Sequence, residues 1–198
     1  MNRRLALAAA FLLASASLRA AEYAIDTRGS NVQFSVPLMV VSKVTGKFVK
    51  YDVTVHAGRK PDLSRASVTA VIEMGSVDTG NDAWDAKLKT PAFFDTAKYP
   101  EIRFRSRSVR KSGGKWEAVG PLTLHGVTKD ITLPFTIEGR FEDPGADEHI
   151  GLHARFQFDR RQYGMAWTGN TEANAVGNMV TVEITLLANR VRASRKGP

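Results

Sequence analysis

The sequence predicts an all-β protein in which seven or eight antiparallel strands form a closed barrel or a sandwich, with one short helix inserted. Apolar and polar residues alternate in a series of short runs, which is the pattern of half-buried strands. Short, often Gly-rich segments separate these runs, and only antiparallel neighbours can be joined by connections that short. Because such a sheet must protect its edge strands, closure into a barrel or packing of two sheets is expected.

The first runs lie in the N-terminal third of the chain. Residues 31–36 alternate strictly and end at Pro37, which cannot donate a hydrogen bond to a neighbouring strand. A weak helical turn is expected over 39–44. Apolar residues then occupy the odd positions of 49–56 and the even positions of 68–73, so each of these runs presents one apolar face.

A single segment has a clear helical pattern. Asn81 or Asp82 can cap its N-terminus, residues 83–89 continue it, and Pro91 prevents the helix from extending further. Trp84 shares a helix face with the residue four positions later.

The remaining runs predict the rest of the sheet. Residues 101–110 and 115–124 would form a hairpin around the glycine pair 113–114, and the His-Gly pair 125–126 suggests a second tight turn. The strands expected after this turn cover 131–137, 152–158 and 180–186.

Composition and charge exclude several functions. The 198 residues include 28 Lys and Arg, 20 Asp and Glu, and no Cys, which gives a formal charge of +8. Without Cys there is no disulfide, thiolate nucleophile, Cys-ligated zinc or iron–sulfur cluster. The densest basic segment places Arg103, Arg105 and Arg107 at alternate positions, which indicates the solvated face of a strand and not a nucleic-acid surface.

The first twenty residues predict a secretory signal peptide. Two Arg precede an uncharged apolar run over 5–18, and small residues follow, with cleavage expected after Ala20. An uncleaved anchor is the alternative, and lipid attachment is excluded because no Cys follows the run. Removing residues 1–20, which carry three Arg and no acid, leaves 178 residues with a charge of +5. We therefore expect export, one domain over 21–192, and a disordered basic tail over 193–198.

Motifs for catalysis or metal binding are missing from the sequence. It contains no Gly-x-Ser-x-Gly elbow, no phosphate-binding loop and no dinucleotide fingerprint. His149 and His153 are the only closely spaced histidines, and positions four apart in a strand are separated by about 13 Å, too far to chelate one metal. We expect surface histidines, no metal site and no enzyme activity.

A series of segments, in order along the chain, resembles the YceI-like family. The similarity runs from about Tyr23 to Val191, which is essentially the whole chain after the expected signal peptide. The matching segments are Tyr23-Ala24-Ile25-Asp26, Ser30-Asn31-Val32-Gln33-Phe34-Ser35-Val36, Val44-Thr45-Gly46-Lys47-Phe48, Ser76-Val77-Asp78-Thr79-Gly80-Asn81 with Asp85 and Leu88, Phe93-Phe94-Asp95, Tyr99-Pro100-Glu101-Ile102, Phe104-Arg105-Ser106, Gly120-Pro121-Leu122-Thr123-Leu124-His125-Gly126-Val127-Thr128-Lys129 and Arg161-Gln162-Tyr163-Gly164-Met165.

This resemblance implies an eight-stranded antiparallel, lipocalin-like barrel that holds a polyisoprenoid chain, from a polyprenyl lipid or an isoprenoid quinone, in the periplasm. It implies no catalysis and no cofactor other than the bound isoprenoid or quinone. It also implies a membrane quinone-handling partner such as a b561-type cytochrome, and it leaves the oligomeric state open, a homodimer included.

Four residues depart from the family pattern. Gly29 and Pro37 each stand where His is usual, Trp84 stands where Arg is usual, and Lys87 stands where His is usual. Polar contacts to a ligand head group would therefore be missing or rebuilt, whereas the apolar faces of the strands are kept.

An apolar chain needs no polar anchor to bind such faces. At about 0.8 kcal/mol per buried CH₂, one five-carbon isoprene unit contributes roughly 3 kcal/mol, so about three or four units support micromolar binding after ordering costs. A filled barrel that serves as a structural or stress-related interaction module is the alternative, and an enzyme acting on lipid head groups through His125 or the His149/His153 pair is a further one. The predicted ligand-binding residues are Phe34, Val36, Phe48, Val53, Phe93, Phe94, Ile102, Phe104, Leu122, Leu124, Phe156, Phe158, Met165, Val182 and Ile184.

Overall fold

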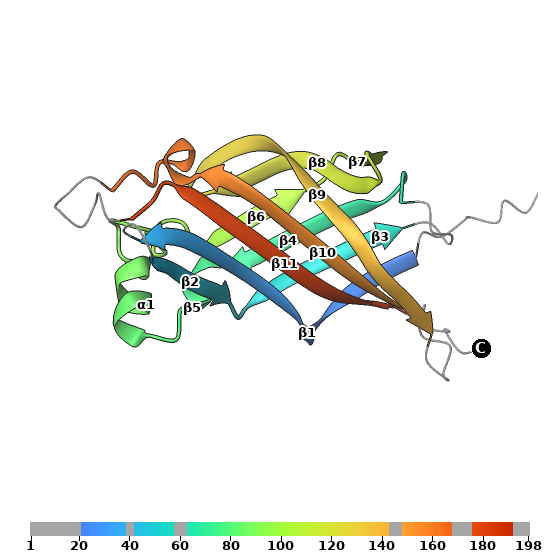
Figure 1. Cartoon of the computed structure of the whole chain (residues 1–198), viewed down its shortest axis with the longest axis horizontal. Coiled ribbons are helices and arrows are strands. Elements are labelled where there is room, and N and C mark those ends of the chain that lie inside the picture. Colours follow the sequence, from blue (N-terminus) through green and yellow to red (C-terminus); the bar gives the residue numbers. More distant parts are fainter. Residues whose placement is uncertain (1–20, 39–41, 58–62, 143–147, 168–175, 192–198) are drawn as a thin grey trace, which may run out of the picture.

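The structure, a computed structural model, is a closed antiparallel sheet with one helix at an end of the barrel (Figure 1). It describes residues 21–38, 42–57, 63–142, 148–167 and 176–191. The elements are β1 (Ala21–Leu38), β2 (Ser42–Phe48), β3 (Tyr51–Ala57), β4 (Ser67–Glu73), η1 (Met74–Ser76), β5 (Val77–Asp78), α1 (Asp82–Lys89), β6 (Glu101–Arg105), β7 (Ser108–Ser112), β8 (Lys115–Leu124), β9 (Val127–Glu142), β10 (Glu148–Asp159), η2 (Arg160–Tyr163) and β11 (Met179–Arg190).

These eleven strand segments build a barrel of eight strands. β2 and β3 both pair with β1, one after the other along its length. On their other side, β4 pairs with β3 and β5 pairs with β2. β6 and β7 both pair with β8 in the same way. Each of these three couples therefore acts as one interrupted strand. Pairing of β1 with β11 closes the sheet, which confirms the predicted fold class.

Buried serine hydroxyls replace ladder hydrogen bonds at two of the interruptions. The Ser76 hydroxyl accepts from the Lys50 N–H at 3.0 Å and donates to the Glu73 carbonyl at 2.7 Å. The Ser106 hydroxyl accepts from the Val68 N–H at 2.8 Å. Because an unpaired buried N–H is costly, these hydroxyls stabilise the breaks.

The helix and both predicted tight turns are confirmed. Asn81 is the N-cap of α1, and its side chain accepts from the backbone N–H groups of Ala83 and Trp84. β7 and β8 form a hairpin across the glycine pair 113–114, and the turn between β8 and β9 holds His125 and Gly126 at φ of 51° and 75°. Positive φ at two consecutive residues is typical of two-residue hairpin turns.

The helical turn expected over 39–44 is wrong where the structure describes it. Residues 42–44 belong to β2 and pair with the end of β1, which runs through Pro37 to Leu38 and does not stop at the proline. Long-range pairing therefore overrides a weak local preference. Residues 39–41 lie outside the described residues.

The face assigned to Val49 is also wrong. Val49 is 52% exposed, whereas Phe48 before it and Val53 after it are buried. The interruption between β2 and β3 shifts the alternation of inward and outward side chains at this point. Counting back in steps of two from the buried Val53 therefore places Val49 on the wrong face.

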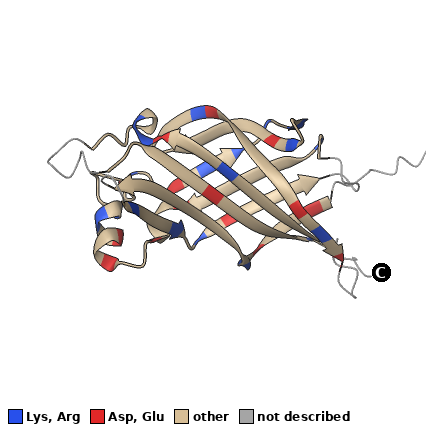
Figure 2. Cartoon of the chain, in the orientation of Figure 1, with Lys and Arg blue, Asp and Glu red and all other residues tan. Residues whose placement is uncertain are grey.

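The outer surface carries both signs of charge, interspersed along the strands (Figure 2). Arg103, Arg105 and Arg107 are exposed as predicted, and Arg103 and Arg107 form ion pairs with Glu101 and Asp130. Within the described ranges, no helix combines the length and the hydropathy needed to cross a membrane. The expected signal peptide and the basic tail fall outside these ranges, so both stay predictions.

Candidate functional site

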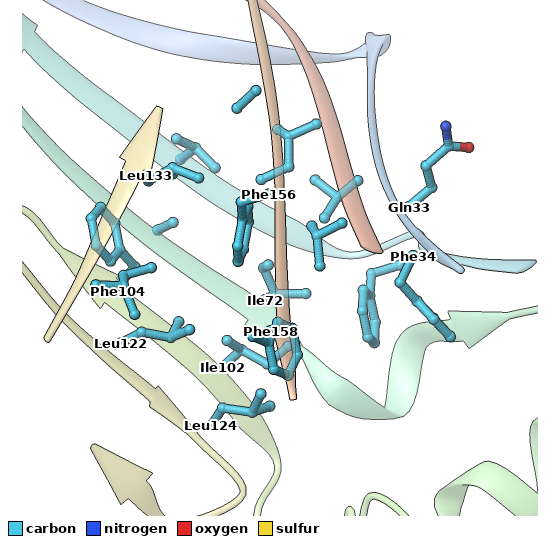
Figure 3. A pocket seen from close by; sticks show the side chains of 18 of the residues that line it. Gln33, Phe34, Ile72, Ile102, Phe104, Leu122, Leu124, Leu133, Phe156 and Phe158 are labelled. Carbon is cyan, nitrogen blue, oxygen red and sulfur yellow. The ribbon is translucent and has the colours of Figure 1, made fainter. Parts of the chain in front are cut away.

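The candidate site is a cavity of about 240 Å³ inside the barrel, lined almost entirely by apolar side chains (Figure 3). A buried water needs only about 10–15 Å³ of such space. The cavity is therefore far larger than a packing defect, and its size argues against a filled barrel.

The middle of the barrel wall faces the cavity. Val68, Ala70 and Ile72 of β4 line the cavity and are only half-buried, as are Val182 and Ile184 of β11. Side chains alternate across a strand, so these residues point away from the outer solvent. The part of their surface that stays accessible therefore faces the lumen and forms its wall.

Fully buried residues close the end of the barrel opposite α1, which we call the floor. Tyr23, Ala57, Leu63, Ala118 and Ala188 all line the cavity there with exposures of 1–4%. Four of these residues belong to β1, β3, β8 and β11, whose ends meet at that side of the barrel (Figure 1). No apolar chain can pass through a floor packed this tightly without rearrangement.

A polar cluster supports the floor. The Tyr23 hydroxyl donates to Glu148 at 2.8 Å, and Glu148 lies 3.3 Å from Arg140 and 3.9 Å from Arg190. Burial, together with the hydrogen bond to Glu148, raises the pKa of Tyr23 to about 12. The cluster joins β1, β9, β10 and β11 at one point.

Aromatic residues gather at the other end, which we call the mouth. Trp84, Phe93 and Phe94, from α1 and the turn after it, line the cavity and stay half-buried. The Phe93 and Trp167 rings lie 5.1 Å apart, so residues 165–167 reach across to this turn.

A phenylalanine triad connects the mouth to the barrel wall. Phe34, Phe48 and Phe94 have ring centroids 5.5–6.2 Å apart. A Cβ on Gly46 would lie 2.7 Å from the Phe34 ring. Glycine at this position therefore lets the ring lie flat against β2.

Two cationic side chains lie at the mouth. Arg160 lines the cavity, and its guanidinium donates to the carbonyls of Met165, Val176 and Gly177. Burial lowers the pKa of Arg160. The Lys87 ammonium lies 5.1–5.8 Å from the ring centroids of Trp84, Phe93 and Trp167.

All fifteen residues predicted to bind ligand line this one cavity. Their role as ligand contacts stays a prediction. The prediction omitted Trp84, Ala70, Leu133, Phe135 and Leu152, which also line the wall. The same two-residue alternation would have identified the four strand residues. Trp84 could not be assigned to the cavity from the sequence, because this assignment depends on where α1 lies relative to the barrel.

The histidines do not converge. His149 lies 2.8 Å from the Asn189 side chain and stacks on Phe141, while His153 lies 3.9 Å from Glu183. Among the residues the structure describes, no group of three or more His, Cys, Asp or Glu could hold a metal ion.

Fold and interior together define a closed, hollow, eight-stranded antiparallel barrel with an apolar lumen. The chain belongs to the YceI-like family, because the model of the YceI-like domain matches residues 23–188. Protein YceI of Escherichia coli O6:H1 is 32% identical over 178 residues, covering 88% of this chain and 92% of that protein.

Solved structures share the fold. Burkholderia cenocepacia BcnA matches with a TM-score of 0.70 and 22% identity over 82% of this chain and 98% of its own. A polyisoprenoid binding domain from Saccharophagus degradans, implicated in plant cell wall breakdown, matches with a TM-score of 0.64 and 17% identity over 85% of this chain and 98% of its own.

Proposed function

We propose that the barrel binds the isoprenoid chain of a polyprenyl lipid or quinone in its lumen, without catalysing a reaction. The observation that carries this proposal is the apolar cavity of about 240 Å³. The polyisoprenoid binding domain of S. degradans, which has the same fold, supports the choice of ligand class.

The dimensions of the lumen suit a chain of several isoprene units. Wall residues of β11 run from Val180 to Ala188, eight steps of about 3.3 Å, or about 26 Å along the strand. With a strand tilt of about 35–45°, this corresponds to about 20 Å along the barrel axis. Burial of roughly 3 kcal/mol per unit then provides the affinity without a polar anchor.

We propose the periplasm as the site of this activity, because an export signal is expected over residues 1–20. There the protein would carry or sequester lipid, and a membrane quinone-handling protein such as a b561-type cytochrome would be its partner.

The test is to identify the guest of the exported protein. The full chain is expressed in a bacterium and recovered from the periplasmic fraction, and its N-terminus is sequenced to check cleavage after Ala20. Organic extraction and mass spectrometry should then release an isoprenoid in near-stoichiometric amount. Folded protein that yields no isoprenoid and takes up no added prenol would overturn the proposal, and a fatty acyl lipid in its place would overturn the ligand class.

A further inference from the structure

We infer that the open end of the barrel docks on the surface of a lipid bilayer that contains anionic lipids, so that the lumen faces the membrane. The docking surface, which we call the rim, consists of Trp84, Ala92, Phe93, Trp167 and Met179. The step from docking to the loading of a guest rests on the proposed function, whereas the rim itself does not.

The lumen reaches solvent at the rim. Ala92, in the turn after α1, lines the cavity and is at the same time exposed. Trp84 and Phe93 also line the cavity and are half-buried. Because fully buried residues close the floor at the other end, the rim surrounds the entrance for an apolar guest.

The rim presents apolar and aromatic side chains to the outside. Met179, the first residue of β11, is 45% exposed. It precedes Val180, which lines the cavity, so the alternation of the strand turns Met179 to the outer face. Trp167 is half-buried against Phe93. Tryptophan favours the boundary between membrane and water, because its ring enters the headgroup region while its N–H stays hydrated, so the rim suits this boundary.

Positive charge beside the rim matches an anionic lipid surface. α1 carries Asp82 and Asp85 in its first turn and its two lysines in its last turn, so opposite charges lie at opposite ends of the helix (Figure 2). The last turn leads into the rim. Lys87 already contacts aromatic rings there. Lys89, and Lys43 near the start of β2, are exposed and are the cations offered to lipid phosphates.

Direct contact with a bilayer removes an obstacle to loading. Each isoprene unit lowers the solubility of a chain in water by about a hundredfold. A free chain of about three units would therefore enter water about a millionfold less readily than a molecule without this chain. A docked rim lets the chain pass from the lipid into the lumen without this step.

The first test measures flotation of the protein, recovered from the periplasmic fraction, with vesicles of phosphatidylcholine alone or mixed with phosphatidylglycerol. We expect at least fivefold tighter binding to the mixed vesicles, and this preference should shrink as salt rises. Equal affinity for both kinds of vesicle would overturn the choice of an anionic surface.

Brominated lipids identify the face that docks. The chain has three tryptophans, so Trp116→Phe leaves Trp84 and Trp167, both in the rim. The emission of this variant should be quenched when it binds mixed vesicles that carry bromine in their acyl chains. Bound protein without quenching would overturn the inference, because docking would then use another face.

Charge variants locate the effect. Met179→Glu should weaken vesicle binding about tenfold or more and leave binding of geranylgeraniol in the absence of vesicles unchanged. Val191→Glu is the matched control, because Val191 is 44% exposed, follows β11 at the floor end, and gives the same change in net charge. Lys89→Glu should weaken binding to mixed vesicles about fivefold or more, whereas Lys115→Glu, at the exposed start of β8, should not. Circular dichroism checks that each variant is folded.

The outcomes separate docking from the proposed function. Protein that yields an isoprenoid guest and binds neither kind of vesicle would overturn docking and leave the lumen proposal standing. Docking by the rim without any extracted or added guest would support docking and overturn the proposed function. Equal weakening by a rim variant and its matched control would reflect general surface charge and would overturn the inference.

Discussion

Replacing Ala70 by Phe should obstruct the lumen without unfolding the barrel. Ala70 lies on β4 between Val53 of β3 and Phe104 of β6, and it lines the cavity while only half-buried. Because Ala70 lines the cavity, we expect a larger side chain at this position to extend into the lumen. The added ring therefore takes space that a ligand would use.

The size of the effect follows from the volume exchanged. A phenyl ring and an isoprene unit are of similar bulk, so Ala70→Phe excludes about one unit from the lumen. Losing the burial of that unit costs roughly 3 kcal/mol, which weakens binding about a hundredfold. The free energy of unfolding should stay within about 1 kcal/mol of wild type, because the ring enters a cavity and creates none.

Thr69→Phe is the matched control, since Thr69 precedes Ala70 on the same strand and is exposed on the outer face. Dissociation constants for geranylgeraniol and urea unfolding curves are measured for both variants. If Ala70→Phe is folded and binds the prenol as tightly as Thr69→Phe does, the ligand does not occupy the lumen and the reasoning fails.

Three further predictions concern the floor, a strand interruption and the triad. Because the pKa of Tyr23 is raised to about 12 from 10.0, the unfolded chain loses this proton first, so stability falls as the pH rises through this range. Urea unfolding in alkaline solution should show a smaller fall for Tyr23→Phe, and an equal fall would contradict the raised pKa of the buried Tyr23 hydroxyl. Ser76→Ala should destabilise the barrel by about 1–3 kcal/mol, since it leaves buried backbone groups unpaired; an unchanged denaturation midpoint would refute this. Gly46→Ala should displace the Phe34 ring, which should lower the free energy of unfolding by about 1–3 kcal/mol and weaken prenol binding. Thermal unfolding measures the first effect and displacement of a fluorescent probe measures the second, and wild-type values in both would contradict the prediction.

Sequence alternation predicts the wall of the lumen well because a strand has a period of two residues. Phe156, Phe158, Val182 and Ile184 are predicted in this way, and all four line the cavity. The alternation holds wherever the ladder is continuous, and it fails at Val49 because the strand is interrupted there.

Other features depend on contacts between distant segments. The pairing of β1 with β11, which closes the barrel, joins residues 146 to 167 positions apart, from Ser35 with Thr181 to Tyr23 with Arg190. The contact of Lys87 in α1 with Trp167, which follows η2, likewise depends on how distant segments pack together. A hollow interior and a filled one have the same apolar alternation, so periodicity cannot distinguish them. The difference lies in how far the wall residues reach toward the barrel axis.

The apolar wall also has a calorimetric consequence. The apolar side chains that make up most of the wall offer no hydrogen bonds to water, so an entering chain should gain dispersion contacts while displacing little bound solvent. Association should therefore release heat near room temperature and carry a negative heat-capacity change. A bound ligand raises the free energy of unfolding with the logarithm of the ligand concentration. The protein without ligand should therefore unfold at a lower temperature than the protein with ligand bound.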